Sequence, residues 1–457
     1  MSSEATPFVE QIARERLERE LPDGKPLLTP GEARAEAERC LFCHDAPCVT
    51  ACPTEIDIPL FIKKIASGNV TGSANTIFES NILGYSCGRV CPVEVLCVGA
   101  CVYNDWHRAP IQIGKLQRYA TETVLARAAK TGKTPLTPKP KTAASRRVAL
   151  IGGGPASLAC AAALALEGHH AVIFERSRLP GGLNTTGVAP YKLHADDALR
   201  EVDFVASLGV EIRTGIEIGS GVSTRSLLGE YDAVFIGIGL GADTRLNVPG
   251  EEGPGIFGAT AFIERLKNDP GFSVAGIKQA LVVGGGNTAI DVARELALLG
   301  VPDVAMVYRR SAQQMTGYAH EMSAARLEGA RLIERAQPVA VIRDEAGNIR
   351  SLRVALTENG VPVAGTEHDL PCDTVVLAIG QSKLRALASE LPGVELDGRG
   401  CVIVEGESRR TGNPRVYAGG DCINGGKEVV NAVADGRDAA RAMMRAWAEA
   451  RGAEKAG

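Results

Sequence analysis

The sequence predicts an α/β protein in three parts: a helical N-terminal domain, then two doubly wound domains, the second inserted into the first. Eight of the twelve cysteines lie between Cys40 and Cys101, which indicates a separate module. Farther along, an apolar strand, a glycine-rich turn, an Ala-rich helix and a second strand follow one another in that order twice. At 457 residues the chain also exceeds the usual size of one hydrophobic core.

Helical spacing dominates the cysteine-rich part. Residues 31–39 are rich in Ala, Glu and Arg, and residues 58–66 and 113–129 repeat apolar residues at helical intervals. Residues 130–147 then carry three prolines among Lys and Thr, which is typical of a stiff, solvated linker. We therefore expect the first domain to cover residues 1–145.

The repeated strand–turn–helix–strand units cover residues 148–175 and 281–310. Two further strands, ending at Gly239 and Gly380, resemble paired crossings between the two domains. With crossings near residues 243 and 380, the expected bounds are 146–243 for the first part of one domain, 244–380 for the inserted domain and 381–457 for the second part.

Composition excludes several classes of protein. A net charge of -4 and a pI near 6.1 lack the basic character expected of a nucleic-acid-binding protein. Residues 1–20 lack the apolar core of a secretory signal, and no later stretch is long enough to span a bilayer. We therefore expect a cytoplasmic protein without membrane contacts. Its thiols should stay reduced, as metal ligands or inert core residues.

The cysteines fall into two groups, Cys40-x2-Cys43-x4-Cys48-x3-Cys52-Pro53 and Cys87-x3-Cys91-Pro92-x4-Cys97-x3-Cys101. In ferredoxin-type sequences, three cysteines of such a run bind one iron–sulfur cube and the fourth, followed by Pro, binds a neighbouring cube. The spacing favours two [4Fe-4S] clusters. Zinc is the alternative, but it favours pairs of C-x2-C knuckles, and these groups offer one such pair, Cys40 and Cys43.

The first glycine-rich turn, Gly152-Gly153-Gly154-Pro155-Ala156-Ser157, follows a strand and opens a helix. Its glycines let a pyrophosphate approach backbone N–H groups at a helix N-terminus. Ser157 replaces the usual third glycine but is small enough for close packing of helix and strand. Glu175 ends the next strand, where it can bind a ribose diol. We interpret this unit as the site for the ADP half of FAD.

The second turn, Gly284-Gly285-Gly286-Asn287-Thr288-Ala289, leads to a strand that ends in Arg309 and Arg310. No acid stands at the ribose position. Guanidinium groups there suit the 2'-phosphate of NADP, so NADPH is favoured over NADH. The alternative is a pair of solvated surface arginines.

Near the C-terminus, a strand at 416–418 leads through Gly420 to Asp421, and a helix is expected from about Val429 to Ala440. The Asp421 carboxylate could bind the ribityl chain of a flavin. The following helix could direct its N-terminus at the electron-accepting edge of the flavin ring.

With these motifs in place, the chain resembles the flavin and iron–sulfur portion of dihydropyrimidine dehydrogenases over nearly its whole length. The small subunit of glutamate synthase is similar but matches less closely. The most specific matches are Cys40-Leu41-Phe42-Cys43-His44-Asp45-Ala46-Pro47-Cys48, Cys87-Gly88-Arg89-Val90-Cys91-Pro92, Leu96-Cys97-Val98-Gly99-Ala100-Cys101 and Phe235-Ile236-Gly237-Ile238-Gly239-Leu240.

The resemblance implies a ligand set for each cluster. Cys40, Cys43, Cys48 and Cys101 would hold one, and Cys52, Cys91, Cys97 and Gln117 the other. Cys87 would then be a bystander, although counting cysteines alone selects it as the eighth ligand.

The resemblance also implies cofactor contacts. Lys192 stands where the family has a flavin-contacting Arg, and Thr316 where it has a further basic residue near the nucleotide phosphate. Flavin contacts are expected at Val90, Gly152, Gly153, Gly154, Pro155, Ala156, Glu175, Gly182, Leu183, Lys192, Ile218, Gly420, Asp421, Val429 and Val430. Nicotinamide-nucleotide contacts are expected at Gly285, Gly286, Asn287, Thr288, Arg309, Arg310, Ala378, Ile379 and Gly380.

The expected reaction is hydride transfer from NADPH, or from NADH, to FAD, followed by release of single electrons to two [4Fe-4S] clusters, with no protein acid, base or nucleophile. The chain lacks the length for the FMN-binding barrel that the resembling enzymes also contain. We therefore expect an electron-input subunit of a hetero-oligomer, with an FMN and iron–sulfur partner that reduces uracil or thymine. The alternatives are a glutamate synthase small subunit, a thioredoxin reductase-like enzyme, which would need a redox Cys-x2-Cys that is absent after Leu281, and a flavoprotein with a zinc-stabilised docking module.

Overall fold

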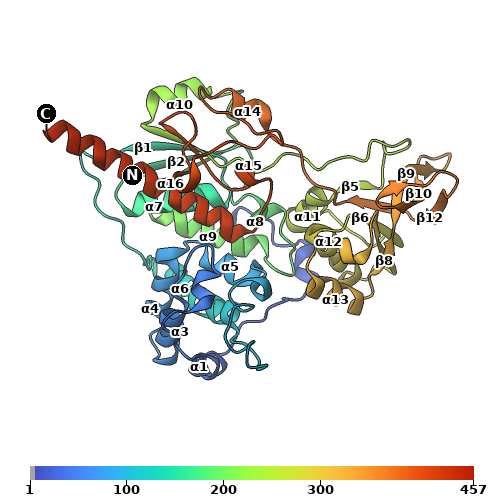
Figure 1. The fold of residues 1–457 in the computed structure, drawn as a ribbon, viewed down its shortest axis with the longest axis horizontal. Coiled ribbons are helices and arrows are strands. Elements are labelled where there is room, and N and C mark those ends of the chain that lie inside the picture. Colours follow the sequence, from blue (N-terminus) through green and yellow to red (C-terminus); the bar gives the residue numbers. More distant parts are fainter. Residues whose placement is uncertain (1–5, 457) are drawn as a thin grey trace.

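The computed structural model describes residues 6–456, so the first five residues of the segment expected to lack a secretory signal, and Gly457, lie outside the description. The chain forms three lobes: a helical lobe at the bottom of Figure 1, a sheet-containing lobe above it and a second sheet-containing lobe to the right. Between residues 6 and 456, no helix combines the length and apolar character needed to cross a membrane.

The helical lobe begins where capping residues start its helices. Thr29 and Glu32 form a capping box at α1, and the Asp57 carboxylate accepts a hydrogen bond of 3.0 Å from the Leu60 N–H at the start of α3. Residues 58–66 form a helix with the predicted bounds, whereas the predicted helix 113–129 continues to Thr131 and ends at Gly132, whose φ is +65°. The helices are α1 (Pro30–Glu38), α2 (Pro47–Thr50), α3 (Ile58–Ala66), α4 (Val70–Ser80), α5 (Gly84–Val90) and α6 (Ile113–Thr131).

The second lobe is built on a parallel sheet with strand order β14-β4-β1-β2-β3. The three central strands of this order are buried on both faces, as expected for a parallel sheet covered by helices, whereas the edge strand that ends the order is partly exposed. The strands are β1 (Arg147–Ile151), β2 (His170–Glu175), β3 (Glu211–Thr214), β4 (Ala233–Ile236) and β14 (Val416–Ala418). The helices are α7 (Pro155–Leu166), α8 (Leu183–Thr186), α9 (Ala195–Ser207), α10 (Thr224–Glu230), α14 (Arg385–Ser389), α15 (Asp421–Asn424) and α16 (Val429–Ala456).

The third lobe has a second parallel sheet, with order β5-β13-β6-β7-β8, and a smaller antiparallel sheet beside it. The parallel strands are β5 (Ile256–Gly258), β6 (Gln279–Val283), β7 (Asp303–Tyr308), β8 (Arg331–Glu334) and β13 (Thr374–Leu377). The antiparallel strands are β9 (Ala336–Arg343), β10 (Ile349–Glu358), β11 (Val361–Pro362) and β12 (His368–Pro371). The helices are α11 (Ala259–Asn268), α12 (Asn287–Leu298) and α13 (Ala319–Leu327).

The chain enters and leaves the third lobe through two segments that pair with each other. The Thr244 N–H donates to the Gly380 carbonyl at 2.8 Å, and Asp243 bridges Gln381 in an antiparallel pair. The second dinucleotide-binding domain is therefore inserted into the first, as the sequence predicts. We propose 1–145, 146–243, 244–380 and 381–457 as the domain bounds, since both crossings fall at these positions.

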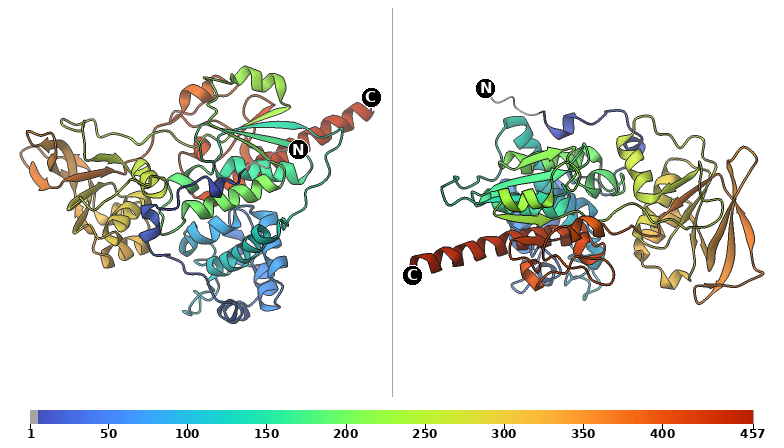
Figure 2. Two further views of the ribbon diagram at one scale, coloured as in Figure 1. Left: turned by 180° about the vertical axis from the view of Figure 1, so that it is seen from behind. Right: turned by 90° about the horizontal axis from the view of Figure 1, so that it is seen from above.

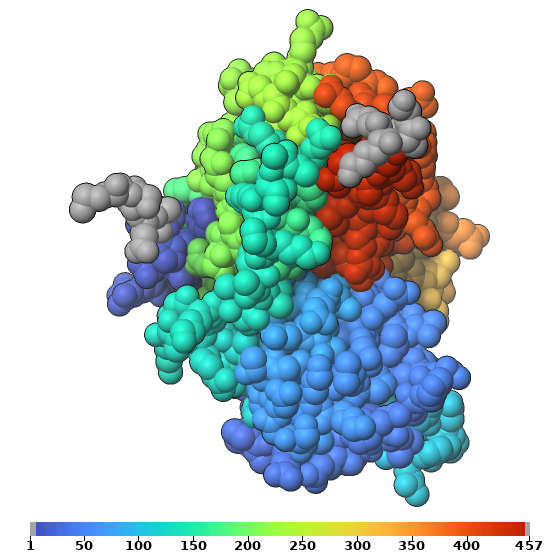
Figure 3. All heavy atoms as spheres, turned by 90° about the vertical axis from the view of Figure 1, so that its left-hand side faces the viewer, coloured from blue at the N-terminus to red at the C-terminus, as the bar shows by residue number. Residues whose placement is uncertain are grey.

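The helical lobe packs on the face of the first sheet that α7, α9 and α16 cover, and the views in Figures 1 and 2 agree on this arrangement. The Phe78 and Phe204 rings lie 5.0 Å apart across this contact. Arg437 of α16 donates to the Thr54 carbonyl, in the helical lobe, at 2.6 Å. In the space-filling view of Figure 3, α16, in red, lies directly above the helical lobe, in blue. One long helix thus fixes the position of the cysteine module on the first sheet.

Candidate functional site

Four predicted ligands of one cluster, which we call the first cysteine group from here on, surround a small cavity near α1 and α3. Cys40, Cys43, Cys48 and Cys101 line it together, with Ile58, Ile62, Ile111 and Tyr103 among the other lining residues. Burial and the neighbouring thiols raise the pKa of Cys48 to about 12. Thiolates in such apolar surroundings need a bound cation, and binding of metal would release their protons. The structure therefore brings together the four residues that the resemblance assigns to one cluster.

The other predicted cysteine ligands, Cys52, Cys91 and Cys97, form the second cysteine group, which lies beside the start of α16. Cys52, Cys91 and Cys97 belong to one apolar cluster with Val93 and Val98. Burial raises the pKa of Cys97, and its neighbours Cys91 and Cys52 add to the shift. The donors suit iron–sulfur cubes, whose ligands are thiolates spread around the cluster. Within residues 6–456, no three His, Cys, Asp or Glu side chains converge on a position for a single ion.

Cys87 and Gln117 lie on α5 and α6, two helices that pack against each other. A hydrogen bond with Cys87, together with burial, raises the pKa of Cys91, so Cys87 lies next to a predicted ligand. Gln117 is buried, and its Nε2 donates to the Gly84 carbonyl at 2.7 Å. That bond orients the carboxamide and leaves its oxygen as the group that could bind iron. The assignment of the eighth ligand to Gln117 stays a prediction.

The first glycine-rich turn forms a cradle in which side chains have no room. Gly152 has a φ of +93°, and a Cβ there would lie 2.6 Å from the Gly237 carbonyl oxygen. A Cβ on Gly182 would lie 2.8 Å from the Gly154 Cα, at the start of α7. The open N-terminus of α7 is therefore lined by main chain, which suits a pyrophosphate. Ser157 fits as the third residue of the motif because Gly237 faces it, and a Cβ on Gly237 would come within 2.2 Å of its Oγ.

Glu175 ends β2 beside this turn. Its carboxylate accepts hydrogen bonds from the Gly153 N–H at 2.6 Å and the Ser177 N–H at 2.7 Å. An open groove follows directly, lined by Arg176, Ser177, Gly215, Ile216, Glu217, Ser220, Gly221 and Val222. Ile218, a predicted flavin contact, lies beside this groove in a bridge with Val222, with its side chain in the core. The fixed carboxylate and the groove together suit the ribose and adenine of FAD.

Asp421 and the start of α16 lie close to the first turn, since a Cβ on Gly420 would lie 3.1 Å from the Ala156 Cβ. Asp421 follows Gly420, whose φ is +77°, and accepts a hydrogen bond of 3.1 Å from the Lys427 N–H. Burial raises the pKa of the Asp421 carboxyl, and the bond from Lys427 opposes the shift. Val429 and Val430, the first residues of α16, pack in the same apolar cluster as Cys52, Cys91 and Cys97. The predicted flavin-ring region thus adjoins the second cysteine group, and Val90 lies directly before Cys91 at the end of α5.

The second glycine-rich turn has the same construction at the start of α12. A Cβ on Gly284 would lie 2.4 Å from the Ala378 carbonyl oxygen, so the turn sits against the end of β13, where Ile379 and Gly380 follow. A Cβ on Gly285 would meet the Tyr308 ring at 2.4 Å. The main chain of Gly286 and Asn287 lies against Gly317, since a Cβ on Gly317 would lie 3.2 Å from the Gly286 carbonyl carbon. The Asn287 Oδ1 accepts from the Tyr318 N–H at 2.9 Å.

Arg309 and Arg310 follow β7, and both side chains are exposed. Their carbonyls are held in place, since the Thr357 hydroxyl donates to Arg309 at 2.6 Å and the Arg335 N–H to Arg310 at 3.0 Å. Thr316 donates its N–H to the Gly285 carbonyl at 3.1 Å, so its side chain stands at the turn where the resembling family has a basic residue. Fixed main chains with exposed guanidinium groups suit recognition of a phosphate.

Lys192 lies between the two dinucleotide-binding domains. Its Nζ binds Asp291 Oδ1 at 2.8 Å and Glu321 Oε1 at 2.9 Å, both from the inserted domain. Burial acts to lower the pKa of Lys192, but the two carboxylates outweigh it and raise the pKa. The ammonium group of Lys192, a predicted flavin contact, therefore forms ion pairs across the domain boundary.

Other residues at these junctions were missed in the sequence. The Tyr318 hydroxyl donates to Glu428 at 2.8 Å, directly before α16, and Lys25 donates to the Cys91 carbonyl at 3.0 Å. Lys267 is fully buried and donates to the carbonyls of Asn184, Val188 and Leu193. These contacts join segments that are distant in the sequence, and no motif or periodic pattern predicts them.

Two protein families match the chain in tandem. The family described as dihydropyrimidine dehydrogenase domain II, 4Fe-4S cluster, matches residues 18–129. The family described as pyridine nucleotide-disulphide oxidoreductase matches residues 146–436, more than half of the chain. The chain belongs to the pyridine nucleotide-disulphide oxidoreductase family. It is an oxidoreductase of FAD, [4Fe-4S] and NAD(P)H, as the sequence predicts, and the cysteine module is the 4Fe-4S domain at its front.

Curated relatives match this oxidoreductase over most of its length. It is 34% identical to the glutamate synthase [NADPH] small chain of Escherichia coli K12, over 92% of each chain. It is 35% identical to the NAD-dependent dihydropyrimidine dehydrogenase subunit PreT of the same organism, over 92% of this chain and 95% of the relative. The putative oxidoreductase AegA of E. coli K12 is 35% identical over 90% of this chain, which spans 65% of AegA.

Among solved structures, the thioredoxin reductase of T. acidophilum matches with a TM-score of 0.53 and 22% identity, covering 67% of this oxidoreductase and 99% of that chain. At this identity the match shows the fold alone. It agrees with the parallel sheets of this chain.

Proposed function

We propose that this oxidoreductase is the electron-input subunit of a dihydropyrimidine dehydrogenase. It oxidises NADPH, or NADH, through FAD and passes the electrons through two [4Fe-4S] clusters to a partner chain that contains FMN and iron–sulfur centres. The partner reduces uracil or thymine, and the two chains form a hetero-oligomer. The named relative PreT, a subunit of such an enzyme, is matched over 95% of its length and supports this proposal.

One observation carries the proposal. Val429 and Val430 at the start of α16 pack against Cys52, Cys91 and Cys97, so the predicted flavin-ring region and the second cysteine group share one apolar cluster. Bound FAD supplies the conversion between a hydride and single electrons. The chain orients the ring through α16, excludes water with this cluster and keeps Asp421 half-buried beside the predicted ribityl position.

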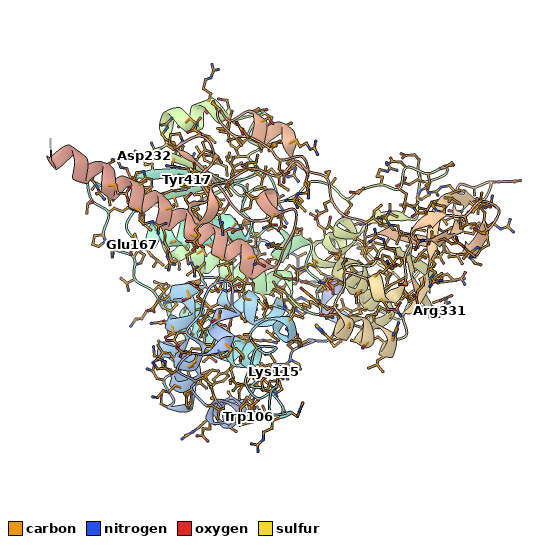
Figure 4. The ribbon with its side chains drawn as sticks, in the orientation of Figure 1. Trp106, Lys115, Glu167, Asp232, Arg331 and Tyr417 are labelled. Carbon is orange, nitrogen blue, oxygen red and sulfur yellow. The ribbon has the colours of Figure 1, made fainter. Side chains whose placement is uncertain are left out.

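The first cysteine group suits the exit from the chain. Tyr103 lines its cavity and packs edge-on against Trp106, with ring centroids 5.7 Å apart. Figure 4 shows Trp106 at the end of the helical lobe farthest from Asp232 and Tyr417 of the first sheet. We define the rim as Leu41, Phe42, Leu60 and Trp106, four apolar side chains that are 37–55% exposed near this group. We propose that the partner contacts the rim, because exposed apolar patches mark interaction sites.

A second function is supported by the match to the glutamate synthase [NADPH] small chain. In that case the same path would deliver electrons to a glutamate-forming large subunit. The residues of this chain that bind cofactors would keep their roles, and only the chain that docks would differ.

Anaerobic co-expression distinguishes the two functions. The chain is produced with an FMN-containing barrel chain or with a large glutaminase chain, and NAD(P)H oxidation is measured with uracil or with glutamine plus 2-oxoglutarate. We expect co-purification with the barrel chain and oxidation that depends on uracil. Oxidation that depends on glutamine and 2-oxoglutarate would instead assign the second function, and iron-free protein from anaerobic preparation would contradict both.

A further inference from the structure

A short N-terminal segment passes between all three lobes before the first cysteine. Leu21 is buried in an apolar cluster with Ala189, Tyr191, Leu298 and Leu299, so it contacts both dinucleotide-binding domains. The Gly24 N–H then donates to the Tyr191 carbonyl at 2.8 Å. The segment is therefore anchored before it reaches the second cysteine group.

The main chain of Lys25 is fixed on both sides. Its N–H donates to Asp23 at 2.9 Å, and its carbonyl accepts from the Arg118 guanidinium. Arg118 also pairs with Asp23 at 2.7 Å. These bonds direct the Lys25 side chain toward α5, where its Nζ donates to the Cys91 carbonyl at 3.0 Å.

The charge of Lys25 is less compensated than that of its cationic neighbours. Arg118 pairs with Glu122 at 2.8 Å and Arg89 with Asp197 at 3.1 Å. Lys25 instead binds a neutral carbonyl, and within residues 6–456 its ammonium group forms no ion pair. Lys25 is half-buried, and a positive charge partly shielded from water acts over a longer distance than a fully solvated one.

We infer that Lys25 is a positioning residue that raises the reduction potential of the cluster bound through Cys91. This inference rests on the proposed path of electrons from flavin to the second cysteine group. Reduction adds a negative charge to a cluster, so a nearby fixed cation stabilises the reduced form. Lys25 thereby makes electron transfer from the flavin to this cluster more favourable.

Potentiometric titration followed by EPR tests the inference on purified holoprotein. In Lys25→Met, we expect the ratio of reduced to oxidised cluster, measured at the wild-type midpoint potential, to fall about tenfold for one of the two clusters. For a one-electron couple, this is a fall of about 59 mV in the midpoint potential. The potentials of the other cluster and of the FAD should stay unchanged, and Lys25→Arg should restore most of the shift. Lys63→Met, at an exposed lysine on α3, is the matched control and should have no effect.

Lys25→Gln separates charge from hydrogen bonding, since its amide can still donate to a carbonyl. If Lys25→Met loses iron, the midpoint potentials of Lys25→Gln test the role of Lys25 instead. Unchanged potentials in Lys25→Gln, or an equal shift of all centres, would overturn the role of Lys25 while leaving the electron path in place. Wild-type protein with no cluster signal would instead contradict the proposed function itself.

Discussion

At the scale of single residues, the eighth cluster ligand shows what spacing can and cannot determine. Cys40, Cys43, Cys48 and Cys101 lie around one cavity as the resemblance implies, although Cys101 is distant in sequence from the other three. The cysteine pattern alone favours Cys87 for the second cluster, because a carboxamide ligand has no signature in the sequence. Gln117 is a candidate because the resemblance to dihydropyrimidine dehydrogenases implies it, and its position on α6, beside α5, is compatible with that role.

Gln117→Ala should remove one of the two clusters. The variant lacks the oxygen that we expect to bind iron, so iron and acid-labile sulfide should fall to about half of the wild-type content. Cys87→Ser is the matched comparison and should keep both clusters, since its side chain is expected to be a bystander. Loss of a cluster in Cys87→Ser with both retained in Gln117→Ala would reverse the assignment.

Arg309 and Arg310 decide the choice of nicotinamide cofactor in our interpretation. Replacing either with Ala removes a charge-assisted hydrogen bond to the 2'-phosphate, worth about 1.5–3 kcal/mol. The KM for NADPH should therefore rise by about tenfold or more, while the KM for NADH stays the same. Steady-state reduction of ferricyanide by each nucleotide measures this. Equal changes for both nucleotides would indicate solvated surface arginines without a role in selection.

At the scale of elements, the predicted strands and turns appear in the structure because each has a local cause. The glycine-rich turns join strands to helices at β1–α7 and β6–α12, close to the predicted positions. The final helix begins at Val429 as predicted but continues far beyond Ala440, to Ala456. Beyond Ala440 the helix still carries Ala442, Met443 and Trp447, and Met443 is fully buried, so the prediction ended the helix too early.

The contact between α16 and α7 depends on one glycine. A Cβ on Gly436 would lie 2.0 Å from the Ala156 carbonyl oxygen, at the predicted pyrophosphate site. Gly436→Ala should separate the two helices, destabilise the protein by about 1–3 kcal/mol and lower its FAD content. Thermal unfolding and the flavin absorbance per chain measure both effects.

Gly452→Ala is the control within the same helix, because nothing lies within 4 Å of a Cβ at that position. It should be neutral or slightly stabilising, since Ala favours helix more than Gly. If both variants unfolded at the wild-type temperature with full flavin, the close approach of α16 to α7 would not matter for cofactor binding.

At the scale of the whole molecule, domain order and insertion follow from the sequence, but the contacts between domains do not. The crossings at Asp243 and Gln381 were visible as two similar strand ends. The pairing of Lys192 with Asp291 and Glu321, and of Tyr318 with Glu428, joins residues about 100 or more positions apart. Charged and polar side chains that meet only after folding leave no periodic pattern in the sequence. The sequence therefore predicts Lys192 as a flavin contact but does not predict its two ion pairs.

The proposed electron path implies an order for the redox centres, and the rim makes that order testable. Trp106→Ser and Leu41→Ser remove exposed apolar surface beside the first cysteine group, and each should slow NADPH oxidation that depends on the partner by about tenfold, the loss typical of an interface anchor. Reduction of ferricyanide should stay unchanged, because a small acceptor needs no docking surface. Leu327→Ser, at a 90% exposed position in the inserted domain, is the control and should affect neither rate. Equal partner-dependent rates in all three variants would place the electron exit elsewhere on the helical lobe.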